Sequence, residues 1–491
     1  MKLIVAKFHT ALRPAQRQLS GFFVKASGLR RIALITAALM GLQGCAILPD
    51  AQRDRAAPHA QQVEFEGARG PVSVAKSDAI VVGLEGKGGA SDVLDKHLAY
   101  EQAVNADSPL VLGNKLTLLQ NGPATYQAMI AAIRAARDHI NLETYIFDDD
   151  EIGGQFADLL LERQAAGIQV NLIYDSVGGL MTPAAFYERL RVGGIQVLEF
   201  NPVNPAAGNK SEWLLNNRDH RKLLVIDGRI AFTGGINFTD VYSSSPLGRR
   251  GRERPGKPPD ASAGWRDTHI QIEGPVVAEF QKLFMDTWAR QKGEPLVAKN
   301  YFPAITAQGN EIVRAIGSTP DDPDSLIYLT LMSAISHAER KVHLTIAYFA
   351  PDPQLRKALI DAAGRGVDVK LVLPGFSDSG PIFHLGRSHY TELLRGGVRI
   401  YERSGGIMHA KTACIDGVWS TIGSTNLDWR SFLHNDEINA VILGRGFAAQ
   451  METMFAQDLA ESEAITLVQW QRRSPLLRLK EQMARVFAYW L

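Results

Sequence analysis

The sequence predicts an α/β fold made of two similar halves. Three observations support this prediction: the composition is that of a globular protein, helix-length segments alternate with short β-branched runs, and the same layout of elements occurs twice. Of the 491 residues, 45% are hydrophobic and 21% are charged, a balance that excludes disordered and polytopic membrane chains. A chain of this length can form two or three domains with their own cores.

The N-terminal 44 residues have the features of a targeting segment. Arg30 and Arg31 precede the uncharged run 32–42, which is too short for a membrane-spanning helix because such a helix needs about 20 residues. The small residue Gly44 before Cys45 resembles the lipobox of bacterial lipoproteins, in which the cysteine is lipidated. We therefore predict a cleaved signal over residues 1–44 and a lipid-anchored, membrane-associated bacterial protein that faces the periplasm. An uncleaved anchor is the alternative.

The segment that follows, residues 45–108, is rich in Ala, Gly, Gln and charged residues and is predicted to be a tether. The second cysteine, Cys414, lies in a strand-like apolar run far from Cys45. This difference in context argues against a disulfide and predicts that Cys414 is a small buried side chain.

The repeat occupies the rest of the chain, and we divide it into a first half, 109–300, and a second half, 301–491. Each half is expected to contain a helix, a strand, a second helix and two further strands that begin after glycine residues. In the first half these strands begin near residues 140, 168 and 195, and in the second near 342, 367 and 398. Alternating helices and strands predict an α/β sandwich with a largely parallel sheet in each half.

Three segments without a counterpart in the other copy remain open in their interpretation. The insertion 202–217 contains Trp213, which either contacts acyl chains or anchors a buried loop. The Arg-rich loop 243–264 either binds anionic head groups or is a solvated loop. The amphipathic C-terminal segment 476–491 either lies on a membrane surface or closes its domain as a docking helix.

Each half also contains one copy of a His-x-Lys-x4-Asp motif. The motifs consist of His220, Lys222 and Asp227 and of His409, Lys411 and Asp416. Residues two apart on a strand face the same side, so each half is expected to present an imidazole beside an ammonium group. Both aspartates open an Asp-Gly pair, which favours a type I′ hairpin turn. We therefore interpret the aspartates as structural rather than catalytic.

A single motif of this kind is weak evidence, but two copies in register with a repeat are specific. Gly234 and Gly423 lie at the same distance after their histidines, and so do Asn237 and Asn426. A metal site is disfavoured because each histidine has a lysine, and no second ligand, on its strand face.

With these residues the sequence resembles the phospholipase D superfamily, and in particular the bacterial cardiolipin synthases. The segments that carry the closer resemblance are 142–147 (LETYIF), 265–269 (WRDTH) and 434–437 (HNDE). The resemblance covers roughly residue 114 to the C-terminus. It implies that the two α/β sandwich halves form one pseudo-dimeric catalytic unit with the active site at their interface.

The resemblance also implies a reaction. One neutral histidine attacks phosphorus to form a phosphohistidine, the other donates a proton to the leaving alkoxide, and the family favours His220 as the nucleophile. Neither a metal nor another cofactor is expected. The side chains expected to hold the non-bridging oxygens are Lys222 and Lys411 with Asn237 and Asn426, and Ser424 and Gly235 are expected to contribute to substrate binding.

Each histidine further requires an orienting acceptor for its second ring nitrogen. By analogy with the family, Glu437 is expected to serve His409. For His220 the corresponding position falls in the inserted loop, so Asp267, just after that loop, is the candidate. The alternative for Asp267 is a salt bridge to Arg266 or a turn cap.

Cardiolipin synthesis is the leading functional hypothesis: transfer of a phosphatidyl group from phosphatidylglycerol or phosphatidylethanolamine to phosphatidylglycerol at a membrane surface. The main alternative is a phospholipase D that hydrolyses phospholipids to phosphatidic acid. A lipid-binding scaffold without activity ranks last because both His/Lys pairs are intact. A net charge of +1 provides no overall attraction to nucleic acid, so no nucleic-acid partner is expected.

Overall fold

The structure is a computed structural model. It describes residues 48–50, 62–84, 93–105, 108–204, 216–244, 264–320, 322, 324–486 and 488. The predicted signal segment, Cys45, Trp213 and the arginines of the loop 243–264 lie outside the described residues. Among the described residues, no helix is both long and apolar enough to span a membrane.

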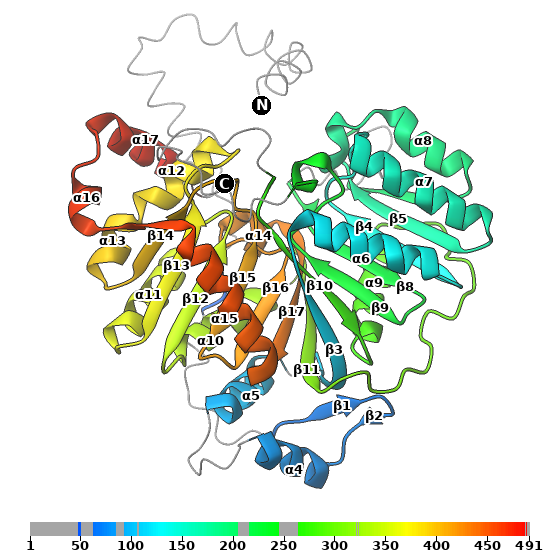
Figure 1. The fold of residues 1–491 in the computed structure, drawn as a ribbon, viewed down its shortest axis with the longest axis horizontal. Coiled ribbons are helices and arrows are strands. Elements are labelled where there is room, and N and C mark those ends of the chain that lie inside the picture. Colours follow the sequence, from blue (N-terminus) through cyan, green and yellow to red (C-terminus); the bar gives the residue numbers. More distant parts are fainter. Residues whose placement is uncertain are drawn as a thin grey trace, which may run out of the picture. The chain divides into compact units, whose positions relative to one another are not determined.

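The first half alternates strands and helices in the predicted order (Figure 1). Its strands are β3 (Leu110–Gln120), β4 (His139–Thr144), β5 (Gln169–Asp175), β6 (Gln196–Phe200), β7 (Arg218–Asp219), β8 (Lys222–Ile226), β9 (Ile230–Gly234) and β10 (Thr268–Glu273). Its helices are α6 (Asn121–Ala135), α7 (Glu151–Ala165), α8 (Ala184–Val192) and α9 (Val277–Arg290), with the short 3-10 helices η3 (Gly178–Met181) and η4 (Asp240–Tyr242).

The second half repeats this arrangement and adds elements at its end. Its strands are β11 (Glu311–Ser318), β12 (Lys341–Ile346), β13 (Asp368–Pro374), β14 (Arg399–Arg403), β15 (Lys411–Ile415), β16 (Trp419–Gly423), β17 (Asn435–Leu443) and β18 (Ser462–Ile465). Its helices are α10 (Leu326–Ser336), α11 (Pro353–Gly364), α12 (Gly380–Ser388), α13 (Tyr390–Arg395), α14 (Trp429–Leu433), α15 (Arg445–Ala460), α16 (Leu467–Gln471) and α17 (Pro475–Val486).

Strand pairing joins the two halves through β3 and β11, which are antiparallel. From this pair the first half continues through β10, β9, β8, β4, β5 and β6, and the second through β17, β16, β15, β12, β13 and β14. Corresponding strands therefore follow one another outward in the same order on both sides.

The prediction of a largely parallel sheet is wrong. Along the strand order just given, β4, β5 and β6 of the first half and β12, β13 and β14 of the second pair in parallel, whereas the other neighbours are antiparallel. The reason is that each His/Lys motif lies in a hairpin, and a hairpin joins antiparallel strands. The α/β class and the two similar halves are confirmed.

Local signals in the sequence explain where the repeated helices begin and end. Asp150 caps α7 by accepting a hydrogen bond from the Gly153 amide at 2.8 Å, and Asp352 caps α11 with Pro353 in its first turn. After the same two helices, Gly167 and Gly366 adopt φ values of 88° and 91°. This left-handed conformation is the one that glycine adopts most easily at a helix end.

The helices cover both faces of the sheets and create three large cores. Helices α6, α7 and α8 bury apolar side chains against the first half, and α10, α11 and α13 do so against the second. A third core lies between α9, α15 and strands of both halves, and it includes Cys414 as predicted. Because this core draws on both halves, they fold as one unit.

The prediction of a tether is wrong for part of residues 45–108. Residues of this segment form β1 (Phe65–Gly67), β2 (Gly70–Pro71), α4 (Val74–Leu84) and α5 (Val93–Val104). In α5, Leu94 and Leu98 are buried in the core of the second half, and Glu101 accepts hydrogen bonds from Arg314 and Trp419. The composition suggested a linker. However, Leu94, Leu98 and Glu101 lie at helical spacing, and these three side chains suffice to dock a short helix.

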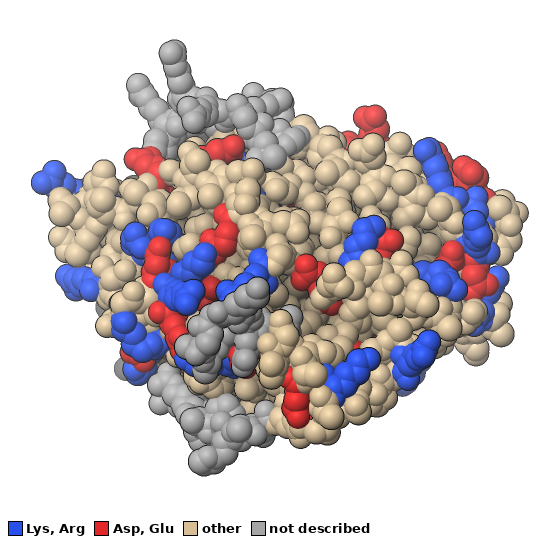
Figure 2. All heavy atoms as spheres, turned by 60° about the horizontal axis from the view of Figure 1, so that its bottom comes forward, with Lys and Arg blue, Asp and Glu red and all other residues tan. Residues whose placement is uncertain are grey.

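On the face shown in Figure 2, Lys and Arg side chains lie among Asp and Glu side chains. The charges on that face are mixed rather than gathered into a field of one sign, which agrees with the net charge of +1.

Candidate active site

Each His/Lys motif docks against a strand of the opposite half. The short strand β7 pairs in parallel with the start of β17, and the His220 amide donates to the Asp436 carbonyl at 2.9 Å. In the same way the His409 amide donates to the Arg266 carbonyl at 2.7 Å. These main-chain bonds hold each histidine beside the strand of the other half that carries its carboxylate partner.

The two carboxylates are Glu437 and Asp267, but their assignment to the histidines is the reverse of the prediction. His220 Nδ1 lies 3.0 Å and 3.1 Å from the two carboxylate oxygens of Glu437. His409 Nδ1 lies 2.7 Å from Oδ2 of Asp267. The prediction paired each histidine with the carboxylate of its own half. It was wrong because each carboxylate lies at the strand that follows its own half's hairpin, and this strand faces the motif of the other half.

The alternative considered for Asp267, a salt bridge to Arg266, is also not what the structure shows. Arg266 forms two charge-assisted hydrogen bonds of 2.7 Å with Asp458 of α15. Asp267 is thereby left to accept from His409 and from the Thr268 amide, which donates at 2.7 Å. The pairing of Arg266 with Asp458 fixes the strand that carries Asp267.

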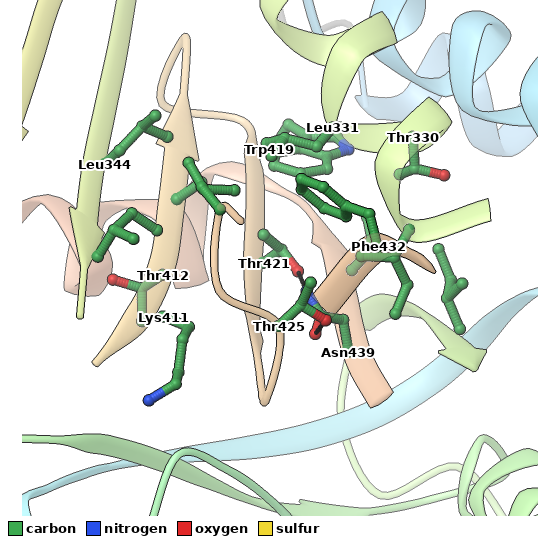
Figure 3. A pocket seen from close by; sticks show the side chains of 16 residues that line it. Thr330, Leu331, Leu344, Lys411, Thr412, Trp419, Thr421, Thr425, Phe432 and Asn439 are labelled. Carbon is green, nitrogen blue, oxygen red and sulfur yellow. Dashed lines mark hydrogen bonds between the residues drawn. The ribbon is translucent and has the colours of Figure 1, made fainter. Parts of the chain in front are cut away.

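The two lysines are buried beside the histidines. Lys222 Nζ donates to the His220 carbonyl at 2.6 Å, and Lys411 Nζ donates to the His409 carbonyl. Each ammonium also lies near an aromatic ring, 5.3 Å from the centroid of Tyr145 and 5.9 Å from that of Tyr348, respectively. Figure 3 shows Lys411 extending from β15 away from the apolar side chains packed around Trp419.

Burial changes the charge state of these groups. It lowers the pKa of His220 to about 4, against the opposing charge of Glu437, and it lowers the pKa of Lys222 to about 7 and of Lys411 to about 8. Burial alone would raise the pKa of Glu437, but the charge and hydrogen bond of His220 outweigh it and hold this pKa at about 2. At pH 7 the site therefore contains a neutral His220 and an ionised Glu437.

His409 is in a more crowded environment than His220. Burial and the charge of Lys411 lower the pKa of His409, while the charge and hydrogen bond of His409 hold the pKa of Asp267 below its usual value despite burial. The hydroxyl of Tyr242 lies 3.0 Å from Nδ1 of His409, the same nitrogen that faces Asp267. The position of Tyr242 corresponds to Ser431 in the other copy, so the two histidines are not equivalent.

Both histidines line one cleft of about 510 Å³ at the junction of the halves. The two asparagines predicted to bind phosphate oxygens, Asn237 and Asn426, line the same cleft. Asn237 Oδ1 accepts a hydrogen bond from the Ile146 amide at 3.3 Å, and the Asn237 side chain also hydrogen-bonds the Tyr242 hydroxyl. Four polar groups thus converge on a space large enough for a phosphodiester and its head group.

Ser424 and Gly235, also predicted to bind substrate, support the two carboxylates. The Ser424 hydroxyl is fully buried and donates to Glu437. A Cβ atom at the corresponding Gly235 would lie 2.2 Å from Oδ1 of Asp267. Neither residue is among those that line the cleft, because the turn that follows each motif packs behind a carboxylate. Direct contact of Ser424 and Gly235 with substrate stays a prediction.

The aspartates of the motifs are turn residues, as predicted. Asp227 and Asp416 have φ values of 53° and 55°, and the glycines that follow also have positive φ, as a type I′ turn requires. The Asp227 carboxylate accepts from the amides of residues 137–139, and that of Asp416 accepts from the amides of residues 339–341. Asp416 additionally lies 3.0 Å from Nε2 of His97 in α5.

Three tyrosines of the site were not predicted from the sequence. Tyr145 and Tyr348 stack edge-on near His220 and His409, with ring centroids 5.2 Å and 5.9 Å apart. Tyr145 follows β4 and Tyr348 follows β12, but strand register places Tyr145 opposite Ala347 and Tyr348 opposite Ile146 of the other copy, so an alignment of the two copies would not have found them. Tyr242 has no equivalent in the other copy either.

Arg221, the middle residue of the first motif, was likewise missed. Its buried guanidinium donates to the Glu437 carbonyl at 3.1 Å, to the Ser318 carbonyl at 3.2 Å and to the Thr287 hydroxyl at 2.6 Å. It thereby ties β17, β11 and α9 together directly behind the His220–Glu437 pair. The corresponding Ala410 makes no such bonds, because an alanine side chain has no donor.

Comparisons with known proteins agree with this geometry. Residues 129–245 and 331–459 match the family described as cardiolipin synthase, PLD-like domain. The chain is 34% identical over 396 residues to the cardiolipin synthase of Geobacillus thermodenitrificans, covering 80% of this chain and 75% of the relative. It is 36% identical over 382 residues to cardiolipin synthase A of Pseudomonas putida, covering 77% of this chain and 76% of the relative.

Among solved structures, the phosphatidylserine synthase of Haemophilus influenzae has the same fold. It superposes with a TM-score of 0.60 at 14% identity, over 80% of this chain and 98% of the other. The two family segments each contain one His/Lys motif, and together they span the cleft. The chain therefore belongs to the cardiolipin synthase family with phospholipase D-like domains.

Proposed function

We propose that this protein is a phosphatidyltransferase of the cardiolipin synthase type. It transfers a phosphatidyl group from one phospholipid to a hydroxyl group of phosphatidylglycerol. The observation that carries the proposal is the pair of crossed His–carboxylate contacts, His220 with Glu437 and His409 with Asp267, on one cleft. The family membership and the names of the relatives support the same activity.

In the first half-reaction, Nε2 of neutral His220 attacks phosphorus. A P–N bond forms, the P–O bond to the head group of the donor breaks, and protonated His409 transfers its proton to the departing alkoxide oxygen. The family resemblance favours His220 as the nucleophile, and its pKa of about 4 is consistent with this role because the imidazole is neutral at pH 7. The negative charge of a bound phosphodiester raises the pKa of His409 and so favours its proton-donating form.

In the second half-reaction His409, now neutral, accepts the proton of the incoming hydroxyl. The hydroxyl oxygen attacks phosphorus, the P–N bond breaks, and His220 returns to its starting state. Glu437 and Asp267 orient the two rings and stabilise their cationic forms. Lys222 and Lys411 with Asn237 and Asn426 balance the charge on the non-bridging oxygens in each transition state.

The acceptor decides between synthesis and hydrolysis. With the purified protein in mixed vesicles of phosphatidylglycerol and phosphatidylethanolamine, the proposal requires cardiolipin as the main product. Phosphatidic acid without cardiolipin would show that water is the acceptor and that the protein is a phospholipase D. Omitting phosphatidylethanolamine identifies the donor: cardiolipin formed from phosphatidylglycerol alone shows that phosphatidylglycerol is both donor and acceptor, and its loss shows that phosphatidylethanolamine is the donor.

We further propose that the protein is a lipid-anchored, membrane-associated lipoprotein that faces the periplasm. The support is the sequence around Cys45 alone, which lies outside the described residues. Acyl labelling with and without globomycin tests this: labelled, processed protein is expected without the inhibitor and a labelled, unprocessed precursor with it, whereas unprocessed protein without label in both cases would support the uncleaved anchor.

A further inference from the structure

The C-terminal helix α17 presents its apolar residues to solvent. Leu476, Leu479, Met483 and Val486 have exposed fractions between 57% and 69%. Their spacing of three, four and three residues places them along one face of the helix. A helix that closed a domain would bury this face, but here the buried residues of α17 are Glu481 and Ala484. Of the two interpretations left open by the sequence, the docking of this face against its own domain is excluded.

The charges around this stripe are basic. Helix α17 carries Arg478, Lys480 and Arg485, and its acid, Glu481, is buried and paired with Arg473. Among the described residues, no carboxylate lies within ion-pair distance of Arg478, Lys480 or Arg485. A basic helix with an exposed apolar face is complementary to an anionic lipid surface, in which the stripe enters the acyl region while the cations meet phosphate groups.

The stripe lies next to the active-site cleft. Ala484 packs with Ile382 of α12 in a small core, and Arg485 donates to the Ser388 hydroxyl at the end of the same helix at 3.0 Å. Ile382 of α12 and Ser379, the residue directly before this helix, also line the cleft that contains both histidines. Figure 1 shows α17 beside α12. A lipid surface that binds α17 therefore lies beside the entrance through which substrate reaches the histidines.

The first half offers a second apolar patch at the corresponding place. The loop that follows β5 contains η3, in which Leu180 and Met181 are 49% and 61% exposed. This loop corresponds to the one that leads from β13 into α12. It contacts the cleft wall, because a Cβ atom at Gly178 would lie 1.8 Å from the Tyr145 carbonyl and Tyr145 lines the cleft. Apolar residues thus stand at the carboxyl ends of equivalent strands in both halves.

We propose that α17, with η3 on the opposite side of the cleft, is the surface by which this protein docks its active site onto an anionic phospholipid bilayer. The proposal rests on the proposed function, since it places the cleft at the source of a phospholipid substrate. It adds the orientation: the carboxyl ends of the parallel strands face the lipid, while α4 and α5 lie away from it.

Hydrogen exchange of the full-length chain tests the docking independently of catalysis. On phosphatidylglycerol vesicles, the amides of residues 475–486 are expected to exchange more slowly than without vesicles, whereas α8 is expected to be unchanged. The inactive variant His409→Ala is expected to show the same protection. Protection restricted to residues 1–47, or protection of α17 already without vesicles, would overturn the proposal, because another segment or a second copy would then cover the stripe.

Kinetics supply the second test. The double variant Leu479→Glu/Met483→Glu is expected to raise the apparent KM on phosphatidylglycerol vesicles roughly tenfold or more and to leave the turnover of a monomeric short-chain phosphatidylglycerol unchanged. Val192→Glu, an exposed apolar position at the far end of α8, is the matched control and is expected to behave like wild type. Equal loss on vesicles and monomers, or no loss on either, would contradict the docking surface.

The two tests separate the docking from the proposed function. If the protein showed no turnover of any phospholipid while α17 was protected on vesicles, the function would fail and the docking would stand. If cardiolipin formed at the wild-type rate in the Leu479→Glu/Met483→Glu variant on vesicles, the docking would fail and the function would stand.

Discussion

His220 Nδ1 lies 3.0 Å from Oε1 of Glu437, a carboxylate contributed by the opposite half of the chain. The reciprocal contact joins His409 and Asp267 at 2.7 Å. Each histidine therefore depends on the other half for its orientation. A half of this protein on its own contains a complete motif but lacks the acceptor for its imidazole.

Replacing Glu437 tests this crossed dependence. Glu437→Gln is expected to lower kcat of phosphatidyl transfer roughly 10²–10⁴-fold, because the amide neither fixes the imidazole tautomer nor stabilises its cation. A double-mutant cycle on the free energy of unfolding is expected to show coupling of about 1–3 kcal/mol between Glu437→Gln and His220→Ala. Coupling with His409→Ala instead would restore the original, uncrossed assignment.

The pH dependence of kcat/KM is expected to reflect the shifted pKa values. His220 must be neutral to attack, and its pKa of about 4 is below the ordinary 6.5, so the acidic decline of rate is expected near pH 4. Lys222 and Lys411 lose charge as pH rises through their pKa values of about 7 and 8, far below the ordinary 10.5. Deprotonation of His409, whose pKa is lowered from the ordinary 6.5, removes the general acid first as pH rises, and loss of charge on Lys222 and Lys411 is expected to lower the rate further between pH 7 and 8.

Lys411→Arg provides the control for the alkaline decline. A guanidinium remains protonated throughout this range, so the contribution of residue 411 to the decline should disappear even if the maximal rate is lower. An unchanged alkaline limb in this variant and in Lys222→Arg would show that other groups control it.

The aspartates of the motifs are expected to affect stability and not chemistry. Asp416→Ala removes the acceptor of three backbone amides and of His97, and is expected to cost about 2–4 kcal/mol of unfolding free energy. Asp227→Ala removes the acceptor of three backbone amides but of no histidine side chain, so it should cost less. Thermal unfolding measures both, and kcat of the folded fraction should stay within a fewfold of wild type. A large drop in kcat without a loss of stability would make the aspartates catalytic.

Arg266 is expected to be essential for the position of Asp267. Arg266→Met leaves Asp458 buried with a weaker partner, Arg403 at 3.5 Å, and is expected to cost about 3–5 kcal/mol. The double variant Arg266→Met/Asp458→Leu should recover much of this loss, because an apolar pair can replace a buried ion pair. Denaturant unfolding checks both, and failure of the double variant to recover any stability would mean that Arg266 acts through its bonds to residues 267 and 268.

The sequence by itself determined the α/β class, the duplication and the identity of the two His/Lys pairs of the site. These features follow from local rules: strand and helix periodicity, the Asp-Gly turn, and spacing that places His220 and Lys222, or His409 and Lys411, on one strand face. A repeat also makes these signals visible twice, which is why the motifs could be identified without a structure.

Only the tertiary structure decided which carboxylate serves which histidine, that Ser424 and Gly235 support carboxylates, and that α5 is part of the fold. Each of these depends on contacts between segments far apart in the chain, such as β7 with β17 and His97 with Asp416. Local patterns carry no information on which of two similar partners a strand edge will meet. The packing of the two halves around a shared core decides that, because it brings β7 beside β17 and thereby His220 beside Glu437.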